Sequence, residues 1–300
     1  MYDHVVLGDG LEKVTHPDHA NTLDILAHAL MAGTTVFGYI DLGVSTRNLP
    51  IAEVKLRIDE WKTTGADGIF LDDYGYDFGT GRARQNEAVD YAHSVGMSVI
   101  ANAFLPEDAF GSQIHTTHNP SGTATSLNSS DFYLYESHQI TVGAFETEAN
   151  WQTKANSLKT FQDLIGFKIF SITTDDSADV YDGGKFFYSW YSALLYGHEA
   201  TGWGEYLFSA DDAIAPFRGR PAITAGTTFT SGVINSSPVF TRSTDLGTIR
   251  VDTSTHASEF QPASGVPALT ERGLILFLLV ITGVFATYRC RPLRPSLELK

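Results

Sequence analysis

The sequence predicts an α/β protein built on a parallel sheet. Short apolar segments alternate with helical patterns across residues 3–208, and a segment that is apolar along its whole length is typical of a strand covered on both faces. We find seven such segments in strand–helix order, and no Gly-x-Gly-x-x-Gly turn follows any of them. These observations favour a (β/α)8 TIM barrel over a doubly wound open sheet, which remains the alternative. Eight strands are needed to close such a barrel, and we expect the first strand to be missing because the chain begins inside the fold.

Hydrophobic periodicity and glycines place the individual elements. Residues 105–130 form a long loop rich in Gly, Ser, Thr, Asn and His, and a loop of that length is usually functional or mobile. Gly33 and Gly166 end two of the helical patterns. Helices are expected over residues 21–31, 51–63, 82–95, 151–165 and 185–200. Strands are expected over residues 4–8, 35–41, 68–72, 97–104, 131–136, 167–173 and 205–208.

The sequence changes character after the barrel. Three short β-branched segments, residues 223–230, 238–244 and 248–252, are separated by Gly, Asn, Ser and Asp, which predicts antiparallel strands in a small β appendage. The predicted organisation is therefore a barrel, a β-rich appendage, a linker, an apolar helix and a basic tail. Their boundaries are residues 1–210, 211–260, 261–272, 273–288 and 289–300.

Residues 273–288 are uncharged and strongly apolar. Arg272 precedes them, and three further arginines follow, which predicts a cytoplasmic tail and an exterior main domain. The segment is slightly shorter than the roughly 20 residues of a typical membrane span, and a buried core helix is the alternative. Residues 1–10 contain no basic and apolar leader, so we expect that the chain starts internally and that the protein is exported and anchored through its C-terminus.

The segment before the apolar stretch carries a resemblance of its own. Val266-Pro267-Ala268-Leu269, followed by apolar and then arginine-rich sequence, resembles the C-terminal sorting signals of bacterial exosortase-type systems, in the variant with an Ile-Pro-Thr-Leu motif. Val266 and Ala268 replace two of the motif residues. The resemblance implies export and a processing enzyme that acts on the tail.

Composition excludes some classes of function. Hydrophobic residues make up 43% of the chain, enough for a packed core. The formal net charge of -15 argues against a nucleic-acid partner, because phosphate binding needs a basic surface. Cys290 is the single cysteine, so the sequence predicts neither a disulfide framework nor a cysteine metal site.

Carboxylates follow four of the predicted strands: Asp41, Asp72 with Asp73, Glu136, and Asp175 with Asp176. Because all strands of a parallel barrel present their C-terminal ends to one face, these acids converge on one site. Two carboxylates on either side of a glycosidic bond are the minimal equipment for glycoside hydrolysis, and crowding separates their pKa values. Nearby residues suited to sugar binding are Tyr39, Tyr74, Asn102 and Tyr133.

Each candidate also has a purely structural interpretation. An aspartate at a strand end is often a cap or turn residue, which applies most to Asp41 and Asp175. His115 and His118 have the spacing of a metal-ligand pair, but a polar loop explains them better without a third ligand. We therefore predict no metal and no cofactor.

Four segments together resemble glycoside hydrolase family 114, which contains endo-α-1,4-polygalactosaminidases and related exopolysaccharide hydrolases. They are Tyr-Ile-Asp-Leu-Gly at 39–43, Gly-Ala-Asp-Gly-Ile-Phe-Leu-Asp-Asp at 65–73, Val-Ile-Ala-Asn at 99–102 and Tyr-Leu-Tyr-Glu at 133–136. The resemblance covers roughly residues 3–208 and implies a TIM barrel, with Asp72 as nucleophile and Glu136 as acid/base of a retaining mechanism. Alternation along a strand lets only one of Asp72 and Asp73 face the site, and the sequence leaves that choice open.

The sequence thus predicts a glycosidase that acts on an exopolysaccharide, with an α-linked amino-sugar polymer as the expected substrate. Two alternatives stay open. One is a non-catalytic carbohydrate-binding or adhesion protein on the same scaffold, and the other is a metal-dependent hydrolase that uses His115, His118 and the aspartates.

Overall fold

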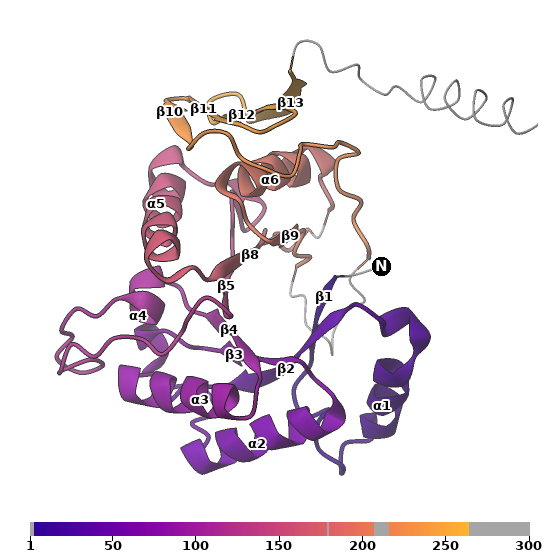
Figure 1. Ribbon diagram of the computed structural model, residues 1–300, viewed down its shortest axis with the longest axis vertical. Coiled ribbons are helices and arrows are strands. Elements are labelled where there is room, and N and C mark those ends of the chain that lie inside the picture. Colours follow the sequence, from indigo (N-terminus) through magenta and orange to yellow (C-terminus); the bar gives the residue numbers. More distant parts are fainter. Residues whose placement is uncertain (1–2, 179, 207–215, 264–300) are drawn as a thin grey trace, which may run out of the picture.

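The computed structural model describes residues 3–178, 180–206 and 216–263 of the chain. Seven strands form one sheet in the order β1-β2-β3-β4-β5-β8-β9 (Figure 1). Every neighbouring pair in this sheet is parallel, which confirms the predicted α/β barrel class. The strands are β1 His4–Leu7, β2 Thr35–Asp41, β3 Gly68–Asp72, β4 Ser98–Asn102, β5 Phe132–Tyr135, β8 Lys168–Ile172 and β9 Ala200–Gly202.

Helices connect these strands and cover the outside of the sheet (Figure 1). They are α1 His19–Ala27, α2 Ile51–Thr64, α3 Arg82–Ser94, α4 Pro106–Phe110, α5 Glu148–Ile165 and α6 Gly183–Tyr196, with single 3₁₀ turns at Ala29–Met31 and Tyr76–Phe78. Helices α2 and α5 end at Gly65 and Gly166, whose positive φ angles allow the left-handed turn that closes a helix.

The sheet curls until its two halves meet across the interior. The rings of His4 in β1 and Phe170 in β8 lie 4.7 Å apart between centroids, and Phe37 in β2 lies 5.4 Å from Phe132 in β5. A buried cluster of Phe37, Phe70, Ile100, Phe132 and Phe170 fills this interior. Within the described residues β1 and β9 each pair with one neighbour only, so the barrel is open between them.

The side chains of each strand point alternately into two different cores. In β3, Ile69 and Leu71 belong to the larger core between sheet and helices, whereas Phe70 belongs to the interior cluster. In the β2–β3 register, Tyr39 lies opposite Phe70 and Asp41 lies opposite Asp72. Inward-pointing residues that come after the aromatic layer in a strand therefore face the C-terminal mouth of the barrel. Barrel enzymes have their active sites at this end.

A four-stranded antiparallel sheet packs on the outer side of α6 (Figure 1). Its strands are β10 Ile234–Ser236, β11 Val239–Ser243, β12 Gly247–Asp252 and β13 Ala257–Pro262. Phe240 of β11 is fully buried, and its ring lies 4.8 Å from that of Trp151 in α5. A two-stranded hairpin, β6 Ile140–Thr141 and β7 Ala144–Phe145, precedes α5.

Three local predictions were wrong. The last barrel strand is Ala200–Gly202 rather than 205–208, because Gly197 ends α6 early; Glu205 and Tyr206 lie outside any strand, and 207–208 lie outside the described residues. Residues 223–230 form no strand, and one isolated bridge joins Phe229 to Thr244. The loop predicted over 105–130 contains α4.

The predicted apolar helix at 273–288 and the sorting motif lie outside the described residues. None of the helices that are described combines the length and the apolar character needed to cross a bilayer.

Gly38 in β2 lies directly against the indole ring of Trp61, and a Cβ at this position would overlap with that ring. Trp61 is fully buried and has no room to move. We expect Gly38→Ala to lower the free energy of unfolding by about 1–3 kcal/mol, measured by urea denaturation. Gly202→Ala in β9 is the matched control, since its Cβ would meet nothing within 4 Å. An equal loss in both variants would contradict this packing.

Candidate active site

Four consecutive strands each place one polar side chain at the mouth of the barrel. Tyr39 comes from β2, Asp72 ends β3, Asn102 ends β4 and Glu136 directly follows β5. Side chains two positions apart in a strand point to the same face of the sheet. An interior aromatic or aliphatic residue lies two positions before each of these polar residues, or four positions before Glu136, so all four polar side chains point to the interior face. The predicted convergence of Asp72, Asn102 and Tyr39 with Glu136 is therefore present in the structure.

The side-chain amide of Asn102 joins the two acids. Its nitrogen donates to Oδ1 of Asp72 at 2.8 Å and to Oε1 of Glu136 at 3.1 Å. Carboxylates only accept hydrogen bonds when ionised, so the NH₂ end of the amide, which has two N–H donors, is the end that can serve both.

These contacts limit the separation of the carboxylates. Two oxygens held at 2.8 and 3.1 Å from one nitrogen lie at most 5.9 Å apart. If each N–H points at its own oxygen, the 120° between the two N–H bonds gives a separation of about 5 Å. Retaining glycosidases hold their two carboxyl groups about 5–5.5 Å apart, whereas inverting enzymes need about 6.5–9.5 Å.

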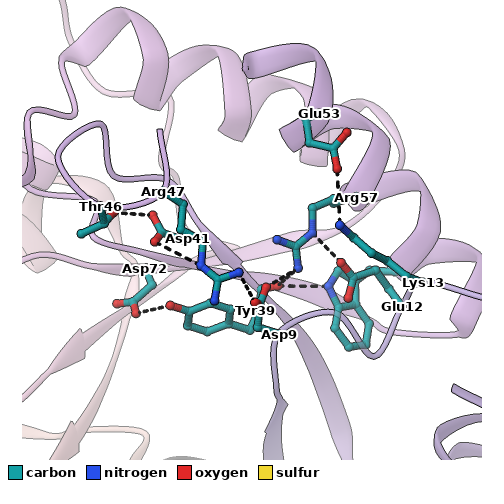
Figure 2. Close-up of polar contacts among 11 residues, drawn as sticks. Asp9, Glu12, Lys13, Tyr39, Asp41, Thr46, Arg47, Glu53, Arg57 and Asp72 are labelled. Atoms are coloured by element: carbon teal, nitrogen blue, oxygen red, sulfur yellow. Dashed lines mark hydrogen bonds and ion pairs between the residues drawn. The ribbon is translucent and has the colours of Figure 1, made fainter. Parts of the chain in front are cut away.

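Tyr39 anchors the second oxygen of Asp72, and Figure 2 shows the two side chains directed toward each other. The hydroxyl of Tyr39 donates to Oδ2 of Asp72 at 2.7 Å. Burial, followed by the charge of Asp72, raises the pKa of Tyr39 well above its usual range, so the hydroxyl remains a donor. The backbone carbonyl of Tyr39 accepts from Trp61 Nε1 at 3.2 Å, which fixes the strand that carries it.

An ion network supports this side of the mouth (Figure 2). The buried guanidinium of Arg57 donates to Glu12 at 2.5 Å and to Asp9 at 2.6 Å. Asp9 also pairs with Arg47, whose guanidinium lies 3.9 Å from Oδ2 of Asp41. The loop after β1 is thus tied to α2 and to the loop after β2.

Asp41 and Asp73 lie beside the nucleophile candidate. Oδ1 of Asp41 accepts from the Gly43 amide and from the Thr46 hydroxyl, each at 2.8 Å. Gly43 lies between the two acids in close contact with both. A Cβ at this position would lie 2.8 Å from the Asp73 Cβ and 3.3 Å from Asp41 Oδ1. Asp73 has a φ of 51°, and this left-handed turn directs its side chain away from the face of the sheet to which Asp72 points. The structure therefore places Asp72, and not Asp73, on Asn102.

Glu136 stands at the open rim, although protein surrounds much of its carboxyl group. Desolvation is the largest influence on its pKa and raises it, and the charge of Asp72 adds to the increase. The Asn102 hydrogen bond and the ammonium group of Lys154 act in the opposite direction. A carboxyl group with a raised pKa is suited to hold a proton for donation.

Three predicted binding residues do not join this cluster. Tyr74 and Tyr133 are fully buried in the core between sheet and helices, and the hydroxyl of Tyr133 donates to the Ala103 carbonyl at 2.5 Å. Asp175 is buried after β8, where Oδ1 accepts from the Asp176 amide at 2.9 Å. In the core, these tyrosines cannot contact a substrate.

The histidine pair has a structural role in the part of the chain that is described. The rings of His115 and His118 each lie 5.2 Å from that of Tyr76, and His115 Nδ1 accepts from the His118 amide at 3.0 Å. The described residues contain no group of three or more His, Cys, Asp or Glu side chains placed to hold a metal ion.

Sequence reasoning missed Asp9, Arg47 and Lys154. Asp9 follows β1 almost directly, so the rule used for the other strand ends would have found it. Arg47 lies in a loop, and Lys154 lies in the middle of α5, where no local pattern distinguishes it from a solvated lysine.

Comparisons with known proteins found no matching family model and no matching curated protein. Among solved structures, the glycoside hydrolase domain of PelA from Pseudomonas aeruginosa aligns at 13% identity over 67% of this chain and 87% of that chain, with a TM-score of 0.41. Ega3 from Aspergillus fumigatus, solved in complex with galactosamine, aligns at 15% identity over 57% and 74%, with a TM-score of 0.33.

Pyruvate carboxylase from Rhizobium etli also aligns, at 11% identity over 64% of this chain and 17% of that chain, with a TM-score of 0.38. Because enzymes of different reaction classes share this level of similarity, we take the function of this chain from the geometry of its site.

Removal of the Asp73 charge should stabilise the protein in a pH-dependent way. Desolvation, followed by the charge of Asp72, raises the pKa of Asp73 to about 6. Ionisation of Asp73 in the folded state therefore costs free energy and destabilises the fold. This cost is fully present above about pH 6 and absent below about pH 4. We expect Asp73→Asn to raise the free energy of unfolding at pH 7 by about 1 kcal/mol, after allowance for solvent screening, with no gain at pH 3.5.

Urea denaturation at several pH values measures this difference. Asp24→Asn is the control, because it removes one carboxyl group from an exposed position on α1. A gain for Asp73→Asn that is the same at pH 3.5 and pH 7 would show that the carboxyl group is not electrostatically crowded.

Proposed function

We propose that this protein is a glycoside hydrolase that cleaves an exopolysaccharide with retention of anomeric configuration. One observation supports the proposal above all others: Asp72 and Glu136 accept hydrogen bonds from the same amide nitrogen of Asn102. This geometry leaves about 5 Å between the facing oxygens, the spacing at which one carboxylate attacks the sugar while the other exchanges protons.

The two acids have different roles in this mechanism. In the first step, protonated Glu136 donates its proton to the glycosidic oxygen while the Asp72 carboxylate attacks the anomeric carbon. The bond to the leaving sugar breaks and a covalent bond to Asp72 forms. In the second step, ionised Glu136 takes a proton from water, whose oxygen attacks the same carbon and releases Asp72.

Environment supports this assignment of roles. The carboxylate of Asp72 accepts two hydrogen bonds, from Tyr39 and Asn102, which stabilise its charged form and fix its orientation. Glu136 accepts one hydrogen bond, from Asn102, and its pKa is raised by desolvation, so it holds a proton more readily. A carboxyl group that holds a proton, beside a carboxylate fixed by two hydrogen bonds, is the pattern of an acid/base pair.

An α-linked amino-sugar polymer is the substrate we propose. Asp41 and Asp73 add carboxyl groups beside Asp72, and an ammonium group on the sugar would relieve their mutual repulsion. The likeness of residues 39–43, 65–73, 99–102 and 133–136 to the polygalactosaminidase family points to the same class of substrate.

We also propose that the protein acts at the cell surface, held there by the apolar segment at 273–288. This part of the proposal is supported by the sequence alone, through the uncharged segment and the arginines around it.

Loss of either acid should greatly slow hydrolysis while the fold persists. We expect Glu136→Gln to lower the rate of reducing-end release from α-1,4-linked galactosaminan by about 10²–10⁴-fold, the usual contribution of a general acid. Asp72→Asn should lower it below detection. Asp90→Asn is the control, since Asp90 is exposed on α3.

Circular dichroism and thermal melting of each variant verify folding. Polymer binding without any release of reducing ends by the wild-type protein would instead favour a non-catalytic carbohydrate-binding protein. Full activity of both acid variants would contradict the proposal.

A further inference from the structure

The most unusual cation near the site is Lys154 on α5. Its ammonium nitrogen lies 4.5 Å from the ring centroid of Tyr135 and 5.8 Å from that of Phe104. Tyr135 is the residue directly before Glu136, and Phe104 is an exposed residue of the loop after β4. No carboxylate oxygen of a described residue lies within 4.0 Å of this ammonium, so two aromatic faces hold it rather than a direct ion pair.

Three carboxylates act on the charge of Lys154, and each of them accepts hydrogen bonds from other groups. Glu107 of α4 accepts from the Ser157 hydroxyl at 2.5 Å. Glu146 accepts from the Thr147 amide at 2.8 Å, with further bonds from Thr141 and Asn150. Glu136 has the single bond from Asn102. Of these three carboxylates, Glu136 has the strongest electrostatic interaction with Lys154.

The two histidines behind β5 are uncharged. His138 is fully buried, its ring 4.8 Å from that of Tyr135, and its pKa is lowered well below the usual range by burial. Burial likewise lowers the pKa of His198 to about 3. Asp72 faces Glu136 from β3 with a negative charge. Among the described groups that act on Glu136, Lys154 is thus the one that supplies positive charge.

We propose that Lys154 is a positioning residue that sets the protonation equilibrium of Glu136, and with it the upper pH limit of hydrolysis. This inference rests on the proposed function of Glu136 as acid/base. A cation kept beyond ion-pair distance acts through its field alone, so it offsets the charge of Asp72 without holding the Glu136 carboxyl group away from the glycosidic oxygen.

The electrostatic effects on Glu136 and Lys154 agree in direction with this proposal. The positive charge of Lys154 lowers the pKa of Glu136 against the increase caused by desolvation. Burial lowers the pKa of Lys154 itself to about 8, so the ammonium form predominates at neutral pH, where the field is needed. The hydrolytic first step requires protonated Glu136, and activity therefore falls as pH rises through its pKa.

Lys154→Met tests the inference, because methionine keeps the apolar stem on the two rings and removes the charge. We expect the pKa of Glu136 to rise, which moves the alkaline limb of the kcat/KM profile upward by about 0.5–1 pH unit. Lys154→Arg should restore the wild-type limb. Lys159→Met on the same helix is the matched control, because it removes the same charge from a partly exposed lysine that pairs with Asp163.

A second readout does not need activity. Carbon-13 NMR of the glutamate side-chain carboxyl groups, with Glu136 assigned from the Glu136→Gln spectrum, follows its titration directly. An upward shift in Lys154→Met and none in Lys159→Met supports the coupling even if no polysaccharide is cleaved, in which case the proposed function fails alone. A Glu136 titration that is unchanged in folded Lys154→Met overturns the inference, whatever happens to the rate.

Discussion

A single amide group, the side chain of Asn102, determines the geometry of the site. It donates to Asp72 at 2.8 Å and to Glu136 at 3.1 Å, and no other hydrogen-bonded side chain among the described residues links the two acids. Two like charges at about 5 Å repel each other, and the amide lowers that cost because both of its hydrogens point at negative oxygens. Without this bridge nothing would fix the separation of the two carboxyl groups, and Asp72 would keep only the hydrogen bond from Tyr39.

The strand order of the barrel brings Asn102 between the acids. Its strand β4 lies between β3 and β5 in the sheet, so the order of the strands alone puts the amide in the middle. The aromatic layer below, from Phe37 to Phe170, sets the height at which the polar residues emerge. Arg57 and Trp61 then hold the backbone of β2, which keeps the Tyr39 hydroxyl on Asp72.

Much of this arrangement could be predicted from the sequence because it follows from local patterns. Apolar segments that end in Asp72, Asn102 and Glu136 predicted strand ends, and parallel strands bring such ends together. The choice between Asp72 and Asp73 could not be predicted, because it depends on a left-handed turn at Asp73 that non-glycine residues rarely adopt. Tyr74 and Tyr133 failed as binding residues since each points to the helix side of the sheet.

Contacts between distant elements were the hardest to foresee. Lys154 reaches Tyr135 from a helix that starts after a hairpin, and the periodicity of α5 contains no sign of it. The ion network of Arg47, Asp9 and Arg57 likewise joins three segments whose proximity only the folded chain reveals (Figure 2). The aromatic layer and the strand order are therefore easier to predict from sequence than the charges that adjust the site.

The anomeric configuration of the first product tests the central claim most directly. Proton NMR, recorded within the first minutes of hydrolysis of an α-1,4-linked galactosaminan, distinguishes the α from the β reducing end before mutarotation mixes them. A spacing of about 5 Å between Asp72 and Glu136 predicts the α anomer, the product of two successive displacements. Initial release of the β anomer would mean that a water molecule fits between the acids, and would contradict the account.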